Sequence, residues 1–135
     1  KWLGGERRIE APLRKNVVSS GERMVRVHRE GKDASSIFRP LAVNEFASLV
    51  EVSLETGRTH QIRVHAAHAG HPLAGDEKYG DEDFNRQLRR LGLRRLFLHA
   101  QALVFEFPDD HTHIDVSAPL DDALLALLEK IDLAL

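Results

Sequence analysis

Apolar residues recur with two different periods along the 135 residues, and the change of period separates predicted strands from predicted helices. Residues 24–28 alternate apolar and polar side chains, which is typical of a half-buried strand. Residues 35–43 and 45–55 are rich in Val, Leu and Phe, and they predict two strands joined by a turn at Asn44. Because Pro40 cannot donate to a strand ladder, the first of these strands should lie at an edge or contain a bulge.

The period then changes to one that suits helices. Apolar residues after Thr59 are spaced as on one face of a helix that ends at Gly70, a frequent helix terminator. Residues 81–92 predict a second, short helix with one apolar face. Residues 119–135 predict a third helix, because leucines recur along one face and two aspartates lie in the first turn, where the helix dipole favours negative charge.

The remaining segments complete the predicted fold. Residues 96–107 predict a long strand, and residues 113–118 its partner across a polar turn. Residues 1–22 contain scattered Gly, Ser and Pro and predict irregular structure. Since strands come first, helices next, and strands again before the last helix, we expect an α+β fold with a mixed, largely antiparallel sheet and flanking helices.

Composition narrows the class of protein. A length of 135 residues suits one domain, and 42% apolar with 30% charged residues is typical of folded globular chains. The absence of cysteine excludes disulfides, thiolate catalysis and cysteine zinc sites. No apolar run approaches the roughly 18 residues of a membrane span and no signal peptide opens the chain, so we expect a cytoplasmic protein without membrane contact.

Charge is distributed unevenly although the net charge is only −2. Residues 1–32 hold nine Lys/Arg against four Glu, whereas residues 109–135 hold one Lys against seven Asp/Glu. A basic end and an acidic end can coexist in a protein that contacts RNA with one face only. Ordinary solvated charge explains the same distribution, and the charges alone do not separate these readings.

Residues 54–81, LETGRTHQIRVHAAHAGHPLAGDEKYGD, gather hydrogen-bonding side chains at a predicted strand-to-helix junction. His65 and His68 could share a helix face, but no H-E-x-x-H or cysteine pattern accompanies them, and we expect no metal and no cofactor. No nucleophile elbow or phosphate-loop sequence is present. A turn at 56–59 would direct backbone N–H groups toward an anion, so a nucleic-acid contact is favoured over a helix capped by Thr59 with solvated polar residues.

The segment TGRTHQIRVHAAHAGHPLAGDEKYGD resembles the signature of the RluA/RluC/RluD family of ribosomal RNA pseudouridine synthases, most closely the RluC branch that acts on large-subunit RNA. The resemblance continues in IEAPLRKNVVSSGERMVRV upstream and in DFNRQL, RLFLHAQAL and APLDDAL downstream. It implies the pseudouridine synthase catalytic-domain fold and an isomerisation without cofactor or metal. In that reaction the N1–C1′ bond of a flipped-out uridine breaks, the base turns, and it is rejoined through C5.

The resemblance also assigns roles to individual residues. Arg63 would pair with the family's catalytic aspartate and keep it ionised. Arg58, His60 and Gln61 would contact the RNA backbone or support the pocket. Thr59 belongs to the same substrate-binding set.

Further positions match apolar and structural parts of the family pattern. Ile62 and Leu98 would line the uracil pocket, although core packing explains both residues equally well. His99 would support the pocket or belong to the core. The G-D-x-x-Y-G element at 75–80, with Asp76, Tyr79 and Gly80, is interpreted as mainly structural.

The sequence departs from the family pattern at the catalytic aspartate. The H-R-L-D-x-x-T-S-G segment and the K-x-Y-x-A tyrosine are absent, and the first residue is Lys1. We expect residues 1–135 to be the C-terminal part of a catalytic domain, with the aspartate segment and any S4-type RNA-binding domain upstream. Such a chain would bind ribosomal RNA, remain inactive alone, and could associate with its missing half or with itself through an exposed sheet edge. The alternative is a non-catalytic RNA-binding fragment.

Overall fold

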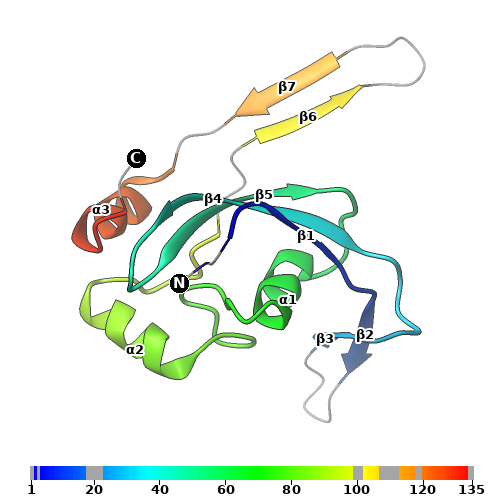
Figure 1. Ribbon diagram of the computed structural model, residues 1–135, viewed down its shortest axis with the longest axis horizontal. Helices are drawn as coiled ribbons and strands as arrows, with labels where there is room; N and C mark the ends of the chain where they lie inside the picture. Colours follow the sequence, from blue (N-terminus) through cyan, green and yellow to red (C-terminus); the bar gives the residue numbers. More distant parts are fainter. Residues whose placement is uncertain are drawn as a thin grey trace.

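The computed structural model describes residues 2, 4–17, 23–98, 102–106, 113–117 and 120–133. A three-stranded antiparallel sheet runs through its centre (Figure 1). In spatial order the strands of this sheet are β1 (Arg7–Glu10), β4 (Ser35–Val43) and β5 (Ser48–Leu54). All strand pairings in the described part of the chain are antiparallel, which agrees with the predicted α+β fold.

The β4–β5 hairpin follows the prediction from the sequence. Its register shifts between Pro40 and Ala42, so the proline lies at an irregularity of the central strand rather than in an edge strand. The side chain of Asn44 forms the turn by accepting hydrogen bonds from the backbone N–H of Phe46 (2.8 Å) and Ala47 (2.9 Å). Asparagine is favoured in such a turn because its side-chain oxygen takes the place of a backbone acceptor.

The expectation of irregular structure over residues 1–22 is wrong for two segments. β1 pairs with β4, and β2 (Leu13–Val17) pairs with β3 (Arg23–Val27) in a separate two-stranded ribbon. These strands are short and rich in charged residues, so their apolar alternation is weak. They are stabilised by partners elsewhere in the chain and by the burial of Ile9, Ala11 and Leu13.

The first two helices begin and end close to the predicted residues, whereas the third ends at Lys130 rather than at 135. The three helices are α1 (Gln61–His68), α2 (Glu82–Arg90) and α3 (Asp122–Lys130). α2 and α3 start at aspartate caps, since Asp81 accepts from Phe84 N (2.8 Å) and Asp121 accepts from Leu124 N (2.9 Å). The predicted start of the third helix at 119 is therefore too early, and α1 starts after His60 rather than at Thr59.

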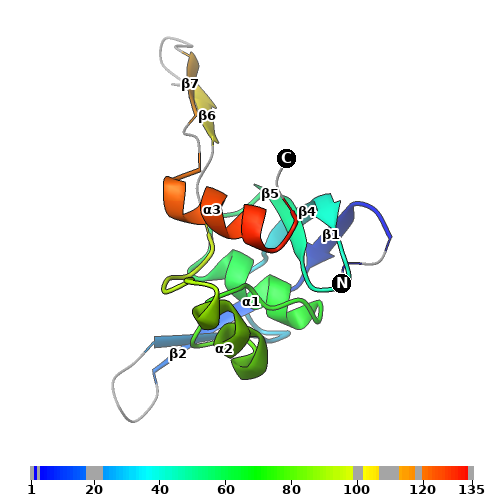
Figure 2. The same cartoon turned by 90° about the vertical axis from the view of Figure 1, so that its left-hand side faces the viewer.

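The predicted long strand over 96–107 is also wrong at its beginning. Residues 96–98 are not in a strand, and β6 (Ala102–Glu106) pairs with β7 (His113–Ser117). The backbone N–H of Phe97 bonds to the carbonyl of Ala74 (2.9 Å), and its ring packs against the α2–α3 cluster. The β6–β7 hairpin projects away from the other elements in both views (Figures 1 and 2).

Besides a cluster of Leu13, Val25, Ala34 and Val64, two further groups of buried apolar residues hold the body together. One lies between the sheet and α1 and includes Trp2, Ile9, Phe38 and Ala66. The other joins α2 to α3 and is made by Leu88, Leu93, Leu124 and Leu127. Within the described residues, no helix has the length and apolar character needed to cross a membrane.

Candidate active site

The first turn of α1 is organised by the amide of Gln61, which is 3% exposed. Its Oε1 accepts hydrogen bonds from the backbone N–H of Arg58 (2.9 Å) and the hydroxyl of Thr56 (2.7 Å). Its Nε2 donates to the carbonyl of Ser35 (2.9 Å) and the hydroxyl of Ser36 (2.7 Å). Gln61 therefore connects α1 to β4. It also accepts the hydrogen bond of the Arg58 N–H, one of the backbone groups that the sequence predicted would face an external anion.

His60 precedes α1 with a left-handed backbone, φ 54° and ψ 20°, and its side chain does not cap the helix. A positive φ is uncommon outside glycine and indicates a locally constrained residue. The side chain of His60 contacts Tyr79, whose hydroxyl lies 2.9 Å from His60 Nδ1 and accepts a hydrogen bond from the backbone N–H of Val25 (2.9 Å). The Tyr79 proton is then available to Nδ1, and a neutral His60 carries its own hydrogen on Nε2.

Arg63 and Asp76 form a two-pronged ion pair. Arg63 Nε donates to Asp76 Oδ2 (2.9 Å) and Nη2 donates to Oδ1 (2.7 Å). The Asp76 side chain is fully buried, whereas that of Arg63 is 18% exposed. The guanidinium carbon also lies 5.2 Å from the centre of the Tyr79 ring, within cation–π range. The arginine is thereby fixed in direction as well as in charge.

The ion pair controls the protonation of both partners. Burial by itself would raise the pKa of Asp76, but hydrogen bonds from Arg63 and from the backbone N–H of Tyr79 and Lys78, together with the Arg63 charge, hold that pKa below its ordinary value. The hydrogen bond to Asp76 raises the pKa of Arg63. Both residues are therefore charged at neutral pH.

The G-D-x-x-Y-G element is shaped by close backbone approaches around Asp76. Gly75 has φ +77°, and a Cβ at this position would lie 2.1 Å from the carbonyl oxygen of Arg95. A Cβ at Gly80 would lie 2.1 Å from the carbonyl oxygen of Asp76. Asn85 of α2 completes the loop by accepting from Gly75 N (2.8 Å) and donating to the Asp76 carbonyl (2.9 Å). Both glycines are needed because any side chain would collide with backbone.

His65 is buried on the other side of α1. Its Nε2 lies 2.9 Å from the carbonyl of Ala11, so Nε2 carries the hydrogen, and Nδ1 accepts from the hydroxyl of Ser36 (2.9 Å). Burial lowers the pKa of His65. With both ring nitrogens engaged, His65 has no lone pair for a metal, and no cluster of three or more candidate metal ligands occurs among the described residues.

The other residues proposed from the sequence are distributed more widely. Arg58 is exposed and donates from Nε to the carbonyl of Asp33 (2.9 Å), and Thr59 is half-buried beside it. Ile62 packs in the cluster under the sheet. Leu98 is partly exposed, and His99 lies outside the described residues.

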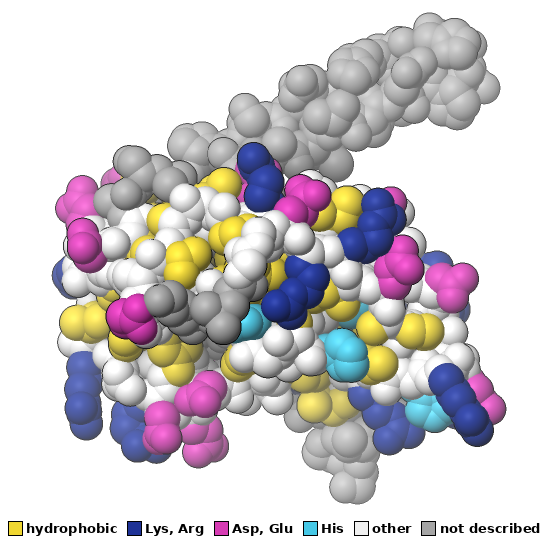
Figure 3. Space-filling view, in the orientation of Figure 1, with side chains coloured by type: hydrophobic (Ala, Val, Ile, Leu, Met, Phe, Trp, Pro, Cys, Tyr) yellow, Lys and Arg dark blue, Asp and Glu magenta, His cyan; other side chains and the backbone are white. Residues whose placement is uncertain are grey.

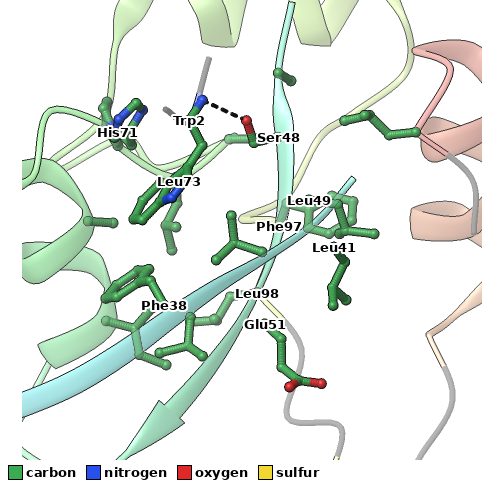
Figure 4. Close-up of a pocket in the computed structure, with 18 of the residues that line it drawn as sticks. Trp2, Phe38, Leu41, Ser48, Leu49, Glu51, His71, Leu73, Phe97 and Leu98 are labelled. Carbon is green, nitrogen blue, oxygen red and sulfur yellow. Dashed lines mark hydrogen bonds between the residues drawn. The ribbon is translucent and has the colours of Figure 1, made fainter. Parts of the chain in front are cut away.

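Ile62 and Leu98 meet at a large apolar hollow between the sheet, the loop after α1, and α3. Figure 4 shows Leu98 there with Trp2, Phe38, Leu41, Leu49 and Phe97. The hollow has a volume of about 1360 Å³, which exceeds the roughly 300–1,000 Å³ of a small-molecule site. Arg63, the next residue after Ile62, lines a different and basic hollow, so the structure does not bring the apolar pair and the arginine together.

The partner of Arg63 within this chain was not predicted from the sequence. Asp76 was interpreted as mainly structural, and Tyr79 likewise, yet both contact the arginine directly. The G-D-x-x-Y-G spacing was the available signal. It could not show the pairing, because Arg63 and Asp76 belong to a helix and a loop whose relative position depends on the tertiary fold.

The chain resembles known proteins in sequence over most of its length. Residues 5–68 match the sequence model of the RNA pseudouridylate synthase family. The chain is 48% identical over 133 residues to the ribosomal large subunit pseudouridine synthase C of Escherichia coli O157:H7, and 51% identical over 124 residues to that of Yersinia pestis. These alignments cover 97% and 92% of this chain but only 42% and 39% of the relatives. The chain thus spans about two fifths of the length of these relatives.

Solved structures show the same relationship. The human RNA pseudouridylate synthase domain containing 1 superposes with a TM-score of 0.73 at 26% identity, covering 94% of this chain and 54% of that one. The human RNA pseudouridylate synthase domain containing 4 has the same fold, with a TM-score of 0.68 at 24% identity, covering 95% of this chain and 57% of that one. By sequence over residues 5–68 and by fold over 94% of its length, the chain is similar to RNA pseudouridylate synthases.

Proposed function

We propose that this chain supplies the arginine-bearing part of an RNA pseudouridine synthase that isomerises uridine in large-subunit ribosomal RNA, a substrate it would meet in the cytoplasm. The observation that carries the proposal is the direction of Arg63. Asp76 engages Nε and Nη2, so of the five N–H donors of a guanidinium three remain, two of them on Nη1. That free edge can receive a second carboxylate.

The second carboxylate would be the catalytic aspartate of the family pattern. A guanidinium beside it lowers its pKa and keeps it ionised, as a nucleophile or proton acceptor requires. In the isomerisation the N1–C1′ bond breaks, the C5–C1′ bond forms, and the proton of C5 leaves while N1 gains one. Within this chain Asp76 would position Arg63, and the His60–Tyr79 contact would fix the start of α1 beside it.

We propose that the aspartate is supplied from outside these 135 residues, because the sequence contains no R-L-D segment. The size and apolar lining of the hollow in Figure 4 support this arrangement, since a protein segment fills such a volume better than a uracil ring. Leu41, Val43 and Leu54 are exposed on β4 and β5, and β5 has an unpaired outer edge in the described sheet. The rest of the catalytic domain would cover these residues.

The test is release of tritium from ribosomal RNA labelled at uridine C5. This chain should release none, whereas a protein extended upstream through an R-L-D segment should release it. In the extended protein Arg63→Lys keeps the charge but loses the paired donors, and release should fall at least about 100-fold while RNA affinity changes little. Arg90→Gln, an exposed substitution on α2, serves as the control.

Three outcomes would contradict parts of the proposal. Release by the 135-residue chain alone would mean that one of its own carboxylates is the nucleophile. RNA binding without release by the extended protein would favour the alternative, a non-catalytic RNA-binding fragment. Near-normal release by Arg63→Lys would remove the pairing role of Arg63.

A further inference from the structure

A second hollow, of about 950 Å³, opens beside Arg63. Its walls come from the start of β3, the G-D-x-x-Y-G loop, the end of α2, and the loop that follows α2. Among the described residues, the lining is strongly basic, with Arg63, Lys78, Arg89, Arg94 and Arg95 against one acidic residue, Glu77. Figure 3 shows basic and acidic side chains interspersed over the face that it draws.

The five cations differ in how far their charge is already compensated. Arg63 is paired with Asp76, and Arg95 with Asp121, with 2.5 Å between Nη1 and Oδ2. The exposed side chains of Arg89 and Arg94 form no hydrogen bond or ion pair with any residue in the described ranges. These two guanidinium groups therefore bring uncompensated positive charge to the hollow.

Arg89 and Arg94 lie on different backbone segments and line one concave surface. Arg89 is in the last turn of α2, and Arg94 follows the turn at Gly92. A guanidinium presents a planar fork of donors that suits phosphate oxygens, and two forks from separate segments can hold one tetrahedral anion. In protein–nucleic acid complexes most polar contacts go to phosphates.

We propose that this basic hollow binds a phosphodiester group of the RNA strand, next to the nucleotide held at Arg63. The inference rests on the proposed function for its choice of RNA as the ligand. Arg63 belongs to both the ion pair and the wall of the hollow, so a phosphate bound by Arg89 and Arg94 would lie beside the reacting nucleotide. The phosphate contact would set the register of the strand, and it would be independent of base sequence.

The experiment measures binding of the 135-residue chain to a fluorescein-labelled single-stranded RNA by anisotropy, between 0.1 M and 1 M KCl. Arg89→Gln and Arg94→Gln should each reduce the slope of log Kd against log salt by about 0.7, the value for one phosphate contact on a single strand. The ratio of variant to wild-type Kd should therefore grow about fivefold as the salt falls tenfold. Arg90→Gln is the matched control, since Arg90 is exposed on α2 and does not line the hollow.

Equal slopes for all three variants would overturn the proposal. A second arm titrates inorganic phosphate at constant ionic strength, and displacement of the RNA by submillimolar phosphate would instead identify a site for a free anion. The outcome is separable from the test of isomerisation. Reduced slopes without tritium release by the extended protein would support the phosphate site and contradict the isomerase. Unchanged slopes with tritium release would support the isomerase and contradict the phosphate site.

Discussion

The polar junction at the start of α1 and the apolar hollow beside β5 differ in how far this chain satisfies their side chains. At the junction, Gln61, His65 and Asp76 are buried and each is hydrogen-bonded to this chain. In the described part of the chain no buried side-chain nitrogen or oxygen lacks a partner. The hollow instead leaves Leu41 and Leu54 exposed.

The difference reflects the physics of the two kinds of surface. A buried polar group without a partner costs about 1–3 kcal/mol, so the polar part must be closed within the chain if it is to hold Arg63 in place. Apolar surface can remain exposed until a partner covers it, because the free-energy cost of exposing it is proportional to the exposed area and small for each residue. The chain therefore satisfies the buried polar groups that support Arg63, while part of its neighbouring apolar face stays exposed.

The largest loss of stability is expected in the packed apolar cluster between α2 and α3. Leu124 is 0% exposed between α2 and α3, so Leu124→Asp would lose its packing and bury a charge. We expect a loss of about 4 kcal/mol or more in the free energy of unfolding, measured in urea. Leu125→Asp is the matched control, because Leu125 is 45% exposed on the same helix. Equal stability of the two variants would mean that α3 is not docked.

The next effect concerns the ion pair at the junction. Asp76→Ala would leave Arg63 without its partner, and breaking a buried pair costs about 3–5 kcal/mol. Because Arg63 is 18% exposed and can reach solvent, we expect a loss near 3 kcal/mol in urea unfolding. Asp83→Ala, at an exposed pair on α2, should change stability by less than about 1 kcal/mol. A similar midpoint for both variants would contradict a closed junction.

Gln61→Ala should cost less, because it removes neutral hydrogen bonds rather than a charge. It would leave Ser35, Ser36, Thr56 and Arg58 each without one partner. We expect about 1–3 kcal/mol in the free energy of unfolding, since part of the opened site is reached by water. Hydrogen exchange at the Arg58 amide should accelerate in the variant, and an unchanged exchange rate would show that Gln61 does not hold this turn.

The smallest effect is the pH dependence of the buried histidine. Burial lowers the pKa of His65, so the unfolded chain binds more protons, and stability should fall as the pH decreases below about 6.5, the ordinary histidine value. The pKa values of His60 and His71 are also lowered by burial and act in the same direction. Asp76 stabilises the fold at neutral pH, and this stabilisation is lost only as the pH falls below about 4, because the pKa of Asp76 is lowered from an ordinary value of about 3.9.

Urea unfolding at pH 7.5, 6.5 and 5.5 would measure this dependence. His65→Gln should lose stability at pH 7.5 but show a weaker decline toward pH 5.5 than the wild type. His68→Gln, at an exposed position one turn further along α1, is the control. An identical pH profile for His65→Gln and the wild type would place the titrating group elsewhere.

Local patterns located much of the fold. The hairpin at Asn44 and the three helices were predicted, and of the edge position or bulge expected at Pro40 the structure has the irregularity, because apolar period, turn chemistry and capping residues act over a few positions. β1 and β2 were missed, since short charged strands are stabilised by partners far away in sequence. The start of the strand predicted at 96 was wrong because Phe97 is drawn into the α2–α3 cluster.

The sequence by itself determined that Arg63 belongs to a polar junction, because the HQIRVH and G-D-x-x-Y-G elements are visible in the order of residues. Only the tertiary structure decided that Asp76 pairs with it, that Gln61 faces the interior, and that Ile62 and Arg63 open onto different hollows. The physical reason is that a side chain's type is local information. Its partner and its exposure depend on how α1, the sheet and the loop at 75–80 pack against one another.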